Sequence, residues 1–287
     1  VQNQLESNTT TAETTETTGL TAFGSDGFTV GALAQLNTST ATYVAWNWNA
    51  GGSNATNTSG TITSTVRANT TSGFSIVTYT GTGSNATVGH GLGVAPSMVI
   101  VKRRNTTGNW PVRHTSITAA NTVYLNTTAA SAASTTTWNS TAPTSTVFSI
   151  GTSTDVNANT GTFVAYCFAE VAGYSEFGSF TGNGNANGPF VYLGFRPAFV
   201  MAKLSSATGD WNMVDDTRQT YNDASGNPVL RANLSSVEED VDTMQGQMDL
   251  LSNGFKLRSN NSSLNLNGGT IIYAAFAESP FKYSLAR

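Results

Sequence analysis

The sequence predicts an all-β fold of tandem antiparallel β-sandwiches, jelly-roll or concanavalin-like, with two full modules and an N-terminal half-module. Its apolar runs are short, rich in β-branched and aromatic residues, and bounded by Gly, Asn and Ser, as strands are. One landmark pattern also repeats: a glycine, then a proline 15 residues on, then a tryptophan 14 residues further. It occurs at Gly81, Pro96 and Trp110, and again at Gly182, Pro197 and Trp211. Repetition at fixed intervals indicates a duplicated unit.

The strands follow from this patterning. Phe74, Ile76 and Thr78 alternate with Ser75 and Val77, which predicts one packed and one solvent-facing side. Ser235–Met248 is the best helix candidate, because acidic residues crowd its start, although Gly246 weakens it. The predicted strands are Gly27–Val30, Thr42–Trp48, Thr61–Val66, Gly73–Thr80, Met98–Arg103, Val112–Thr115, Thr146–Ile150, Thr162–Ala169, Phe177–Phe180, Phe190–Leu193, Phe199–Lys203, Met213–Asp215, Phe255–Arg258 and Thr270–Ala277.

A second motif, a strand-like run, recurs at Thr42–Trp48, Thr162–Phe168 and Thr270–Phe276. The opening text from Leu5 to Asn8 matches Leu230 to Asn233, so the sequence starts within a repeat. We therefore predict a partial β-module over 1–50, a linker with a possible extra strand over 51–72, and β-sandwich modules over 73–172 and 173–287. The half-module needs strands from residues before Val1 or from a neighbouring subunit, because unpaired strand edges aggregate.

Composition limits the function classes. Charged residues make up 10% of the chain and the net charge is −4, with no basic cluster beyond Lys102–Arg104. This argues against a nucleic-acid partner. No apolar run is long enough to cross a membrane, so we expect no membrane insertion. The one cysteine, Cys167, lies at an alternating strand position and is expected to be a small core residue.

Catalytic chemistry is not indicated. A base needs a nucleophile and an orienting group within hydrogen-bond reach, and no local sequence around His90, His114 or Cys167 supplies them. We therefore expect no enzyme activity, no catalytic residues and no cofactor. Acidic residues at 215–216 with Asp223, and at 238–242, offer oxygen ligands, but they lack a calcium-loop pattern and are interpreted as solvated acidic stretches, so no metal site is predicted.

The repeated landmarks are interpreted as scaffold. Gly81 and Gly182 are expected to allow special turn backbone. Pro96 and Pro197 should start strands, and the two landmark tryptophans should anchor cores. The remaining candidates for binding a ligand, a sugar above all, are an aromatic and a neighbouring polar residue in each of two loops: Trp138, Asn139, Tyr221 and Asp223.

Long stretches of this sequence resemble a family. They are residues 73–83, 89–96, 194–200 and 277–283. They resemble a domain family of unassigned function in tail-fibre-like and other structural proteins of marine bacteriophages. The resemblance implies a virion surface protein without a catalytic mechanism.

The function expected from these observations is a non-enzymatic virion component, namely a tail fibre, capsid fibre or decoration protein that acts in assembly and host attachment. The alternative is a carbohydrate-binding or adhesin module for a cell-surface glycan. The expected partners are copies of the chain itself, with a trimer preferred, other virion proteins and a host-surface glycan. The expected location is the virion surface or the extracellular space.

Overall fold

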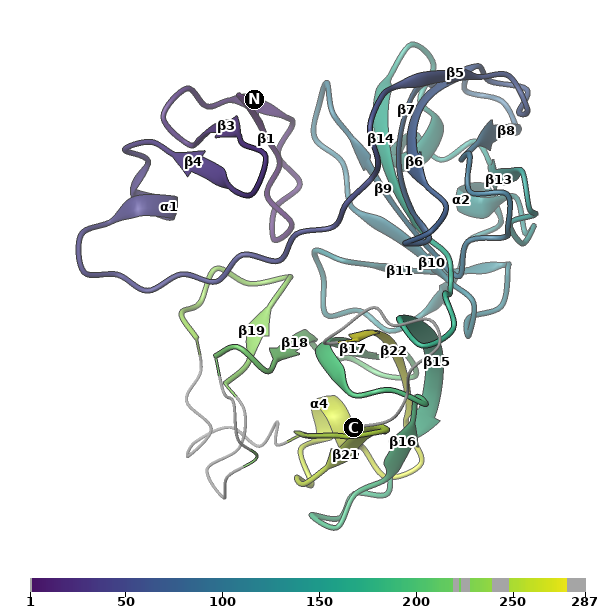
Figure 1. The fold of residues 1–287 in the computed structure, drawn as a ribbon. Helices are drawn as coiled ribbons and strands as arrows, with labels where there is room; N and C mark the ends of the chain where they lie inside the picture. The colour runs from purple at the N-terminus through teal and green to yellow at the C-terminus, as the bar shows by residue number, and fades with distance from the viewer. Residues whose placement is uncertain (1, 219–221, 223–227, 239–247, 278–287) are drawn as a thin grey trace.

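The computed structural model describes residues 2–218, 222, 228–238 and 248–277 and is mostly β, with antiparallel sheets and a few short helices (Figure 1). The predicted all-β, antiparallel character is therefore confirmed. The helices are α1 (Ala34–Asn37), α2 (Thr135–Trp138), α3 (Thr154–Asn157) and α4 (Ser262–Asn265). The strands are β1 (Asn3–Gln4), β2 (Thr14–Thr15), β3 (Leu20–Phe23), β4 (Phe28–Val30), β5 (Ala55–Asn57), β6 (Ser64–Asn69), β7 (Phe74–Thr80), β8 (Ala86–Gly89), β9 (Met98–Arg103), β10 (Pro111–His114), β11 (Asn121–Tyr124), β12 (Ala132–Ala133), β13 (Val147–Ile150), β14 (Thr162–Phe168), β15 (Ser175–Thr181), β16 (Phe190–Tyr192), β17 (Pro197–Leu204), β18 (Trp211–Asp215), β19 (Leu230–Arg231), β20 (Met248–Leu251), β21 (Gly254–Leu257) and β22 (Thr270–Ala277).

Three lobes are visible in Figure 1: an N-terminal lobe with β1 to β4, a second lobe with β5 to β14, and a third with β15 to β22. The second lobe holds an eight-stranded sheet, whose inner order is β11-β10-β9-β14-β7. The third holds a five-stranded sheet of order β19-β18-β17-β22-β15. Counted along the chain from β7 in the second lobe and from β15 in the third, the two orders are the same. Each lobe also has a small sheet, β13-β8 in the second and β16-β21-β20 in the third.

Three hydrophobic cores hold these layers together. One core lies between the large and small sheets of the second lobe, around Phe148 and Phe163, and one lies in the third lobe, around Phe255 and Leu257. The remaining core contains side chains from both large sheets, including Trp110 and Trp211. Both tryptophans are buried at corresponding strand ends, as the landmark spacing predicted. The two lobes therefore share apolar surface, which couples their stabilities.

Most predicted strands are present, and Met98–Arg103 and Thr270–Ala277 have the predicted bounds. The prediction of a strand at Thr42–Trp48 was wrong. This segment is not a strand, because it pairs with no described strand. The stretch 51–72 contains two strands, β5 and β6, which extend the large sheet beside β7. The predicted helix over Ser235–Met248 is not found where it can be checked. Residues 235–238 are not helical and Met248 begins β20, while 239–247 lie outside the described residues.

The landmark glycines serve a different purpose from the predicted one. Neither Gly81 nor Gly182 has a positive φ. A Cβ atom at Gly81 would lie 2.3 Å from the carbonyl oxygen of Ala158, and one at Gly182 would lie 2.3 Å from that of Leu266. The requirement is thus for close backbone approach directly after β7 in the second lobe and directly after β15 in the third.

We expect Gly182→Ala to lower the free energy of unfolding by about 1–3 kcal/mol or more, because the added methyl group overlaps backbone that cannot move freely. Gly52→Ala is the matched control, since a Cβ there meets nothing within 4 Å. That control should be neutral or slightly stabilising, through a less flexible unfolded chain. Denaturant titration of both variants measures the difference, and equal stabilities would contradict the close-approach explanation.

Candidate functional site: two buried lysine joints

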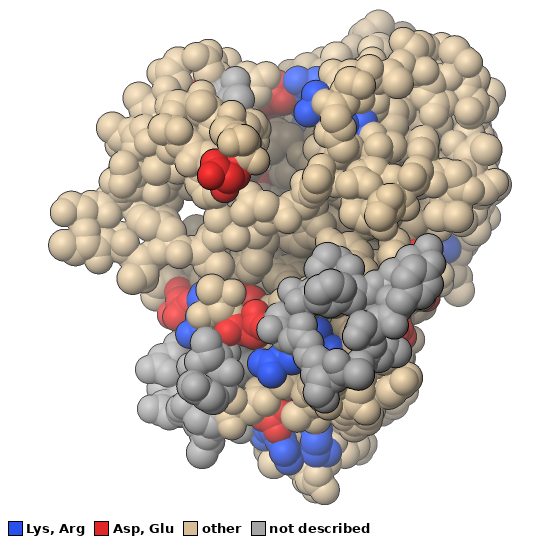
Figure 2. All heavy atoms as spheres, in the orientation of Figure 1, with Lys and Arg blue, Asp and Glu red and all other residues tan. Residues whose placement is uncertain are grey.

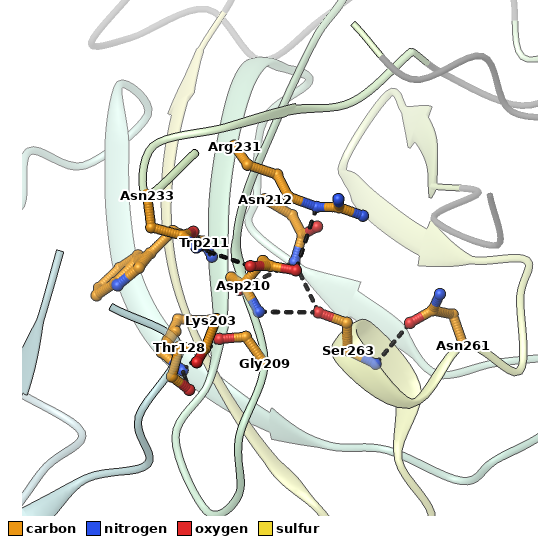
Figure 3. Close-up of polar contacts among 10 residues, drawn as sticks. All are labelled: Thr128, Lys203, Gly209, Asp210, Trp211, Asn212, Arg231, Asn233, Asn261 and Ser263. Atoms are coloured by element: carbon orange, nitrogen blue, oxygen red, sulfur yellow. Dashed lines mark hydrogen bonds and ion pairs between the residues drawn. The ribbon is translucent and has the colours of Figure 1, made fainter. Parts of the chain in front are cut away.

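The most elaborate polar centre lies where the second lobe meets the third, around Lys203 near the end of β17 (Figure 3). Its side chain is fully buried. Its Nζ donates hydrogen bonds to the carbonyl oxygens of Thr128 at 3.0 Å, Leu204 at 3.0 Å and Gly209 at 2.7 Å. Thr128 belongs to the second lobe, and the other two belong to the third. The ammonium therefore ties a segment of one lobe to a turn of the other.

Trp211 and Asp210 complete this joint. The Trp211 indole Nε1 donates to the carbonyl oxygen of Tyr124 at 2.9 Å, again from the second lobe. The Trp211 amide donates to Asn233 Oδ1 at 2.9 Å, and Asn233 Nδ2 donates to Asp210 Oδ1 at 2.7 Å. The Asp210 amide donates to Ser263 Oγ at 3.2 Å, and Arg231 Nε pairs with the Asp210 carboxylate at 3.4 Å. Dashed lines mark both contacts in Figure 3.

A second joint of the same design lies where the N-terminal lobe meets the second lobe. Lys102 is fully buried, and its Nζ donates to the carbonyl oxygens of Thr10 at 3.2 Å, Arg103 at 2.9 Å and Gly108 at 3.1 Å. The Trp110 indole donates to the carbonyl oxygen of Thr9 at 3.1 Å. Here the incoming segment comes from the N-terminal lobe.

Backbone hydrogen bonds repeat in the two joints as well. The Gly108 amide donates to Thr10 at 2.9 Å, and the Gly209 amide donates to Thr128 at the same distance. At the edge of each joint, the backbone amide of Glu13 donates to the carbonyl oxygen of Arg104, and the backbone amide of Ser131 donates to that of Ser205, both at 2.8 Å. Each complete lobe thus has a lysine–tryptophan corner that binds an extended segment from the preceding lobe.

Burial sets the electrostatics of both lysines. Desolvation lowers the pKa of Lys203 to about 8, against a smaller raising effect of Asp210. It also lowers the pKa of Lys102, which Asp155 raises and Arg103 lowers to smaller extents. A lysine with a lowered pKa can act as a nucleophile when it is accessible. These two have three carbonyl acceptors each and no exposed surface, so the arrangement can hold backbone in place but offers no reactive nitrogen.

We predict that an amine-acylating reagent at pH 8.5 modifies Lys203 in the folded protein at least ~100-fold more slowly than Lys256, because reaction needs local opening. Lys256 is the matched comparison, since among the described residues its Nζ donates to one carbonyl oxygen, that of Gly188, and its side chain is only partly buried. Peptide mass spectrometry over time measures both rates. In denaturant the two should react alike, and fast acylation of Lys203 in the folded state would mean that the joint is open to solvent.

The two large sheets also meet through polar and aromatic contacts. His114 Nε2, in the tautomer that carries a proton there, donates to the carbonyl oxygen of Tyr273 at 3.0 Å, and its Nδ1 accepts from the Ser116 amide. Desolvation lowers the pKa of His114 to about 4; the bond to Tyr273 raises it and Arg113 lowers it. Trp48 from the N-terminal region packs edge-on against Phe199. The neutral histidine and the rings therefore seal the contact between lobes.

The predicted ligand residues do not form one site. Trp138 is 1% exposed and belongs to the core of the second lobe, so its ring cannot stack on a sugar. This corrects its choice as a binding residue: Trp138 ends α2 and packs inward. Asn139 follows it, exposed, in a left-handed conformation with φ of 49°. Tyr221 and Asp223 lie outside the described residues.

The other titratable side chains that the sequence analysis considered are buried or paired within the fold, where the structure describes them. Burial raises the pKa of the Cys167 thiol to about 12, which makes it a poor nucleophile. His90 is buried, and desolvation lowers its pKa. Asp215 accepts hydrogen bonds from the Trp46 indole and pairs with Arg218 at 2.7 Å. Within the described ranges no three His, Cys, Asp or Glu side chains are grouped as a metal site would require.

The lysine joints are the site that sequence reasoning missed, although a signal existed. Lysine, glycine and tryptophan recur with one spacing at Lys102, Gly108 and Trp110 and at Lys203, Gly209 and Trp211. A charged residue inside an apolar strand, repeated with the landmarks, indicates a buried and fully bonded group.

Among the described residues, no helix is both long and apolar enough to span a bilayer.

These features define an antiparallel β-sheet protein whose lobes interlock through buried lysines and tryptophans. The chain belongs to the family described as Domain of unknown function (DUF7483), whose model matches residues 1–280. No curated protein matches the sequence, and no solved structure matches the fold.

Proposed function

We propose that this protein is a non-enzymatic structural component of a bacteriophage virion, a tail fibre, capsid fibre or decoration protein that acts in assembly and host attachment. We also propose that its lobes are repeats of one β-sandwich module, over 73–172 and 173–287, with a partial module over 1–50. The matching strand orders support the repeat. The stretches that resemble marine bacteriophage structural proteins support the virion role.

The observation that carries the non-enzymatic part is the fate of the reactive side chains. The two buried lysines donate to backbone carbonyls, and His114 bonds Tyr273 across the lobe contact. Groups that could perform chemistry are therefore used to fix lobes to one another. A rigid arrangement of this kind suits a protein that holds loops away from a particle, where weak contacts add through multivalency.

The proposed partners are copies of the chain, with a trimer preferred, and other virion proteins. The proposed location is the virion surface. Imaging of native particles labelled with an antibody against this chain tests the role: ordered label at a fixed position on the particle supports it. Absence of the protein from purified infectious particles would overturn it.

The second candidate is a carbohydrate-binding or adhesin module. It is favoured by the aromatic pair Phe190 and Tyr192, both exposed on the edge strand β16, beside an Asn-rich loop over 183–187. Exposed aromatic rings near amide groups suit sugar stacking. Saturable binding on a glycan array that Tyr192→Ala abolishes, and Trp138→Phe preserves, would favour this candidate.

A further inference from the structure

The N-terminal lobe repeats one half of the second lobe at residue level. In the hairpin β1-β2, Asn3 pairs with Thr15 and Gln4 with Thr14. In β11-β12, Asn121 pairs with Ala133 and Thr122 with Ala132, each 118 residues further along the chain. In both hairpins, the segment that connects the two strands is the one that fills a lysine joint. They are therefore the same element in two lobes.

The correspondence continues after the hairpin. Helix α1 (Ala34–Asn37) and α3 (Thr154–Asn157) are 120 residues apart. Each is followed, at Thr40 and at Thr160, by a threonine with positive φ, 67° and 59°. The next segment, Thr42–Trp48, then corresponds to strand β14 (Thr162–Phe168). The N-terminal lobe thus holds equivalents of β11 to β14 but not, among the described residues, of β7 to β10.

The core of the N-terminal lobe is open where those strands would lie. Phe28 is 43% exposed, and its equivalent Phe148 is 1% exposed. Tyr43 is 50% exposed, whereas Phe163 is completely buried. In the second lobe, Tyr79 on β7 packs on both Phe148 and Phe163. Phe28 and Tyr43 therefore occupy core positions of the repeat, at which the second lobe has Tyr79 of β7 as cover.

The same gap explains why Thr42–Trp48 is not a strand. Its equivalent β14 is hydrogen-bonded to β7 on one side and β9 on the other. Trp48 nevertheless packs toward the core shared by the lobes, against Phe276. Beside it lies a pocket of about 580 Å³ whose lining includes Leu5, Trp48, Ile76 and Tyr166, next to the hollow visible in Figure 2 between the N-terminal and second lobes.

The third lobe also points to the missing element. Segments around Thr10 and Thr128 each fill a lysine joint in the following lobe. The corresponding segment of the third lobe follows β19, and there Val237 is 84% exposed. This segment lies beside the N-terminal lobe, because Ser7 Oγ donates to the carbonyl of Ala232 at 2.7 Å. A third lysine corner at that place would close the lobes into a ring.

We propose that the open side of the N-terminal lobe is the docking site for a polypeptide segment of the type of residues 73–118, the glycine–proline–tryptophan half of this repeat. The docked segment supplies strands on both sides of Thr42–Trp48, places a tyrosine over Phe28 and Tyr43, and brings a third buried lysine corner to the segment after β19. The apolar lining and free strand edges fit such a β-sheet unit. This inference rests on the module repeat proposed above and not on the virion role.

The test is a chain with a second copy of residues 73–118 placed directly before Val1. In the second lobe residue 118 precedes Ala119, the equivalent of Val1, so the copy enters with the connection that it has there. Amide hydrogen exchange in 42–48 should slow at least ~100-fold, toward the rate of Thr162–Phe168 in the same molecule. The matched control carries Tyr79→Ser and Trp110→Ser within the copied segment only, and it should leave exchange in 42–48 fast.

Unchanged exchange in 42–48, with 162–168 still protected, would overturn the proposal. Slow exchange in 42–48 of the unextended chain, lost on dilution, would also overturn it, because a second copy would then be the cover. If the extended chain does not fold, the unextended chain is titrated with a peptide of residues 73–118. Saturable protection of 42–48 supports the proposal, and the absence of any protection contradicts it. Neither result depends on a virion.

Discussion

Replacing Trp211 with alanine will lower the free energy of unfolding by about 3–5 kcal/mol, the usual cost of truncating a buried large aromatic side chain. The ring is 2% exposed in the core that both large sheets share. Its loss leaves a cavity between the lobes and also removes the indole hydrogen bond to Tyr124. Denaturant titration followed by circular dichroism measures the change.

Two further variants make this result specific. Trp110→Ala removes the equivalent ring and its bond to Thr9, and it should cost a similar amount. Tyr192→Ala removes an aromatic ring that is 64% exposed, and it should change stability by less than about 0.5 kcal/mol. A small loss for both tryptophan variants would mean that the rings do not anchor the lobes.

Acidification from pH 6.5 to pH 4 will destabilise the protein by about 3 kcal/mol through His114 alone. Burial lowers the pKa of this histidine from 6.5 to about 4 in the folded state, so the unfolded chain binds a proton in this range and the folded one does not. The free energy of unfolding decreases as the pH is lowered wherever the unfolded state binds more protons than the folded state. Each pKa unit corresponds to about 1.4 kcal/mol. Below pH 4 the folded form is protonated too, and the effect levels off.

The measurement is the free energy of unfolding at pH 7 and pH 4.5 for the natural chain and for His114→Gln. Glutamine keeps a donor for the Tyr273 carbonyl but does not titrate. The variant should therefore be less stable at pH 7 and lose much less on acidification. His90→Gln is the matched control and should keep the His114 part of the slope. An unchanged slope in His114→Gln would assign the acid effect to other groups.

Local sequence patterning predicted most of the strands, since alternation and β-branched runs reflect one buried face. Met98–Arg103 and Thr270–Ala277 are interior strands of the large sheets, and each has a partner strand on both sides. Thr42–Trp48 has the same pattern but pairs with no described strand, and a strand is stable only as part of a sheet. Propensity cannot report whether a partner is present. The same limit applies to β5, where no strand was predicted and where the neighbouring strand β6 supplies the pairing.

The candidate site was less predictable, because burial is a property of the whole fold. Trp138 looked like a loop residue among Thr, Ser and Asn, yet the short helix α2 turns its ring into the core. Lys102 and Lys203 lie at or near the ends of predicted strands, and the sequence analysis gave neither a role in a site. They are buried because a distant segment brings backbone carbonyls to them, and sequence separation hides that contact. The repeat of lysine with glycine and tryptophan was the available clue.

The order of the joints along the chain has a consequence for biosynthesis. The residues that fill each lysine corner, around Thr10 and Thr128, precede the corner that receives them. During translation, each of these segments therefore leaves the ribosome before the lysine corner that binds it. Each newly made corner can bind a segment that is already outside the exit tunnel, so the lysine ammonium need not lose its water before its carbonyl acceptors are present. The hairpin β11-β12 stays unengaged until Lys203 and Trp211 have emerged, which makes the third lobe dependent on prior folding of the second.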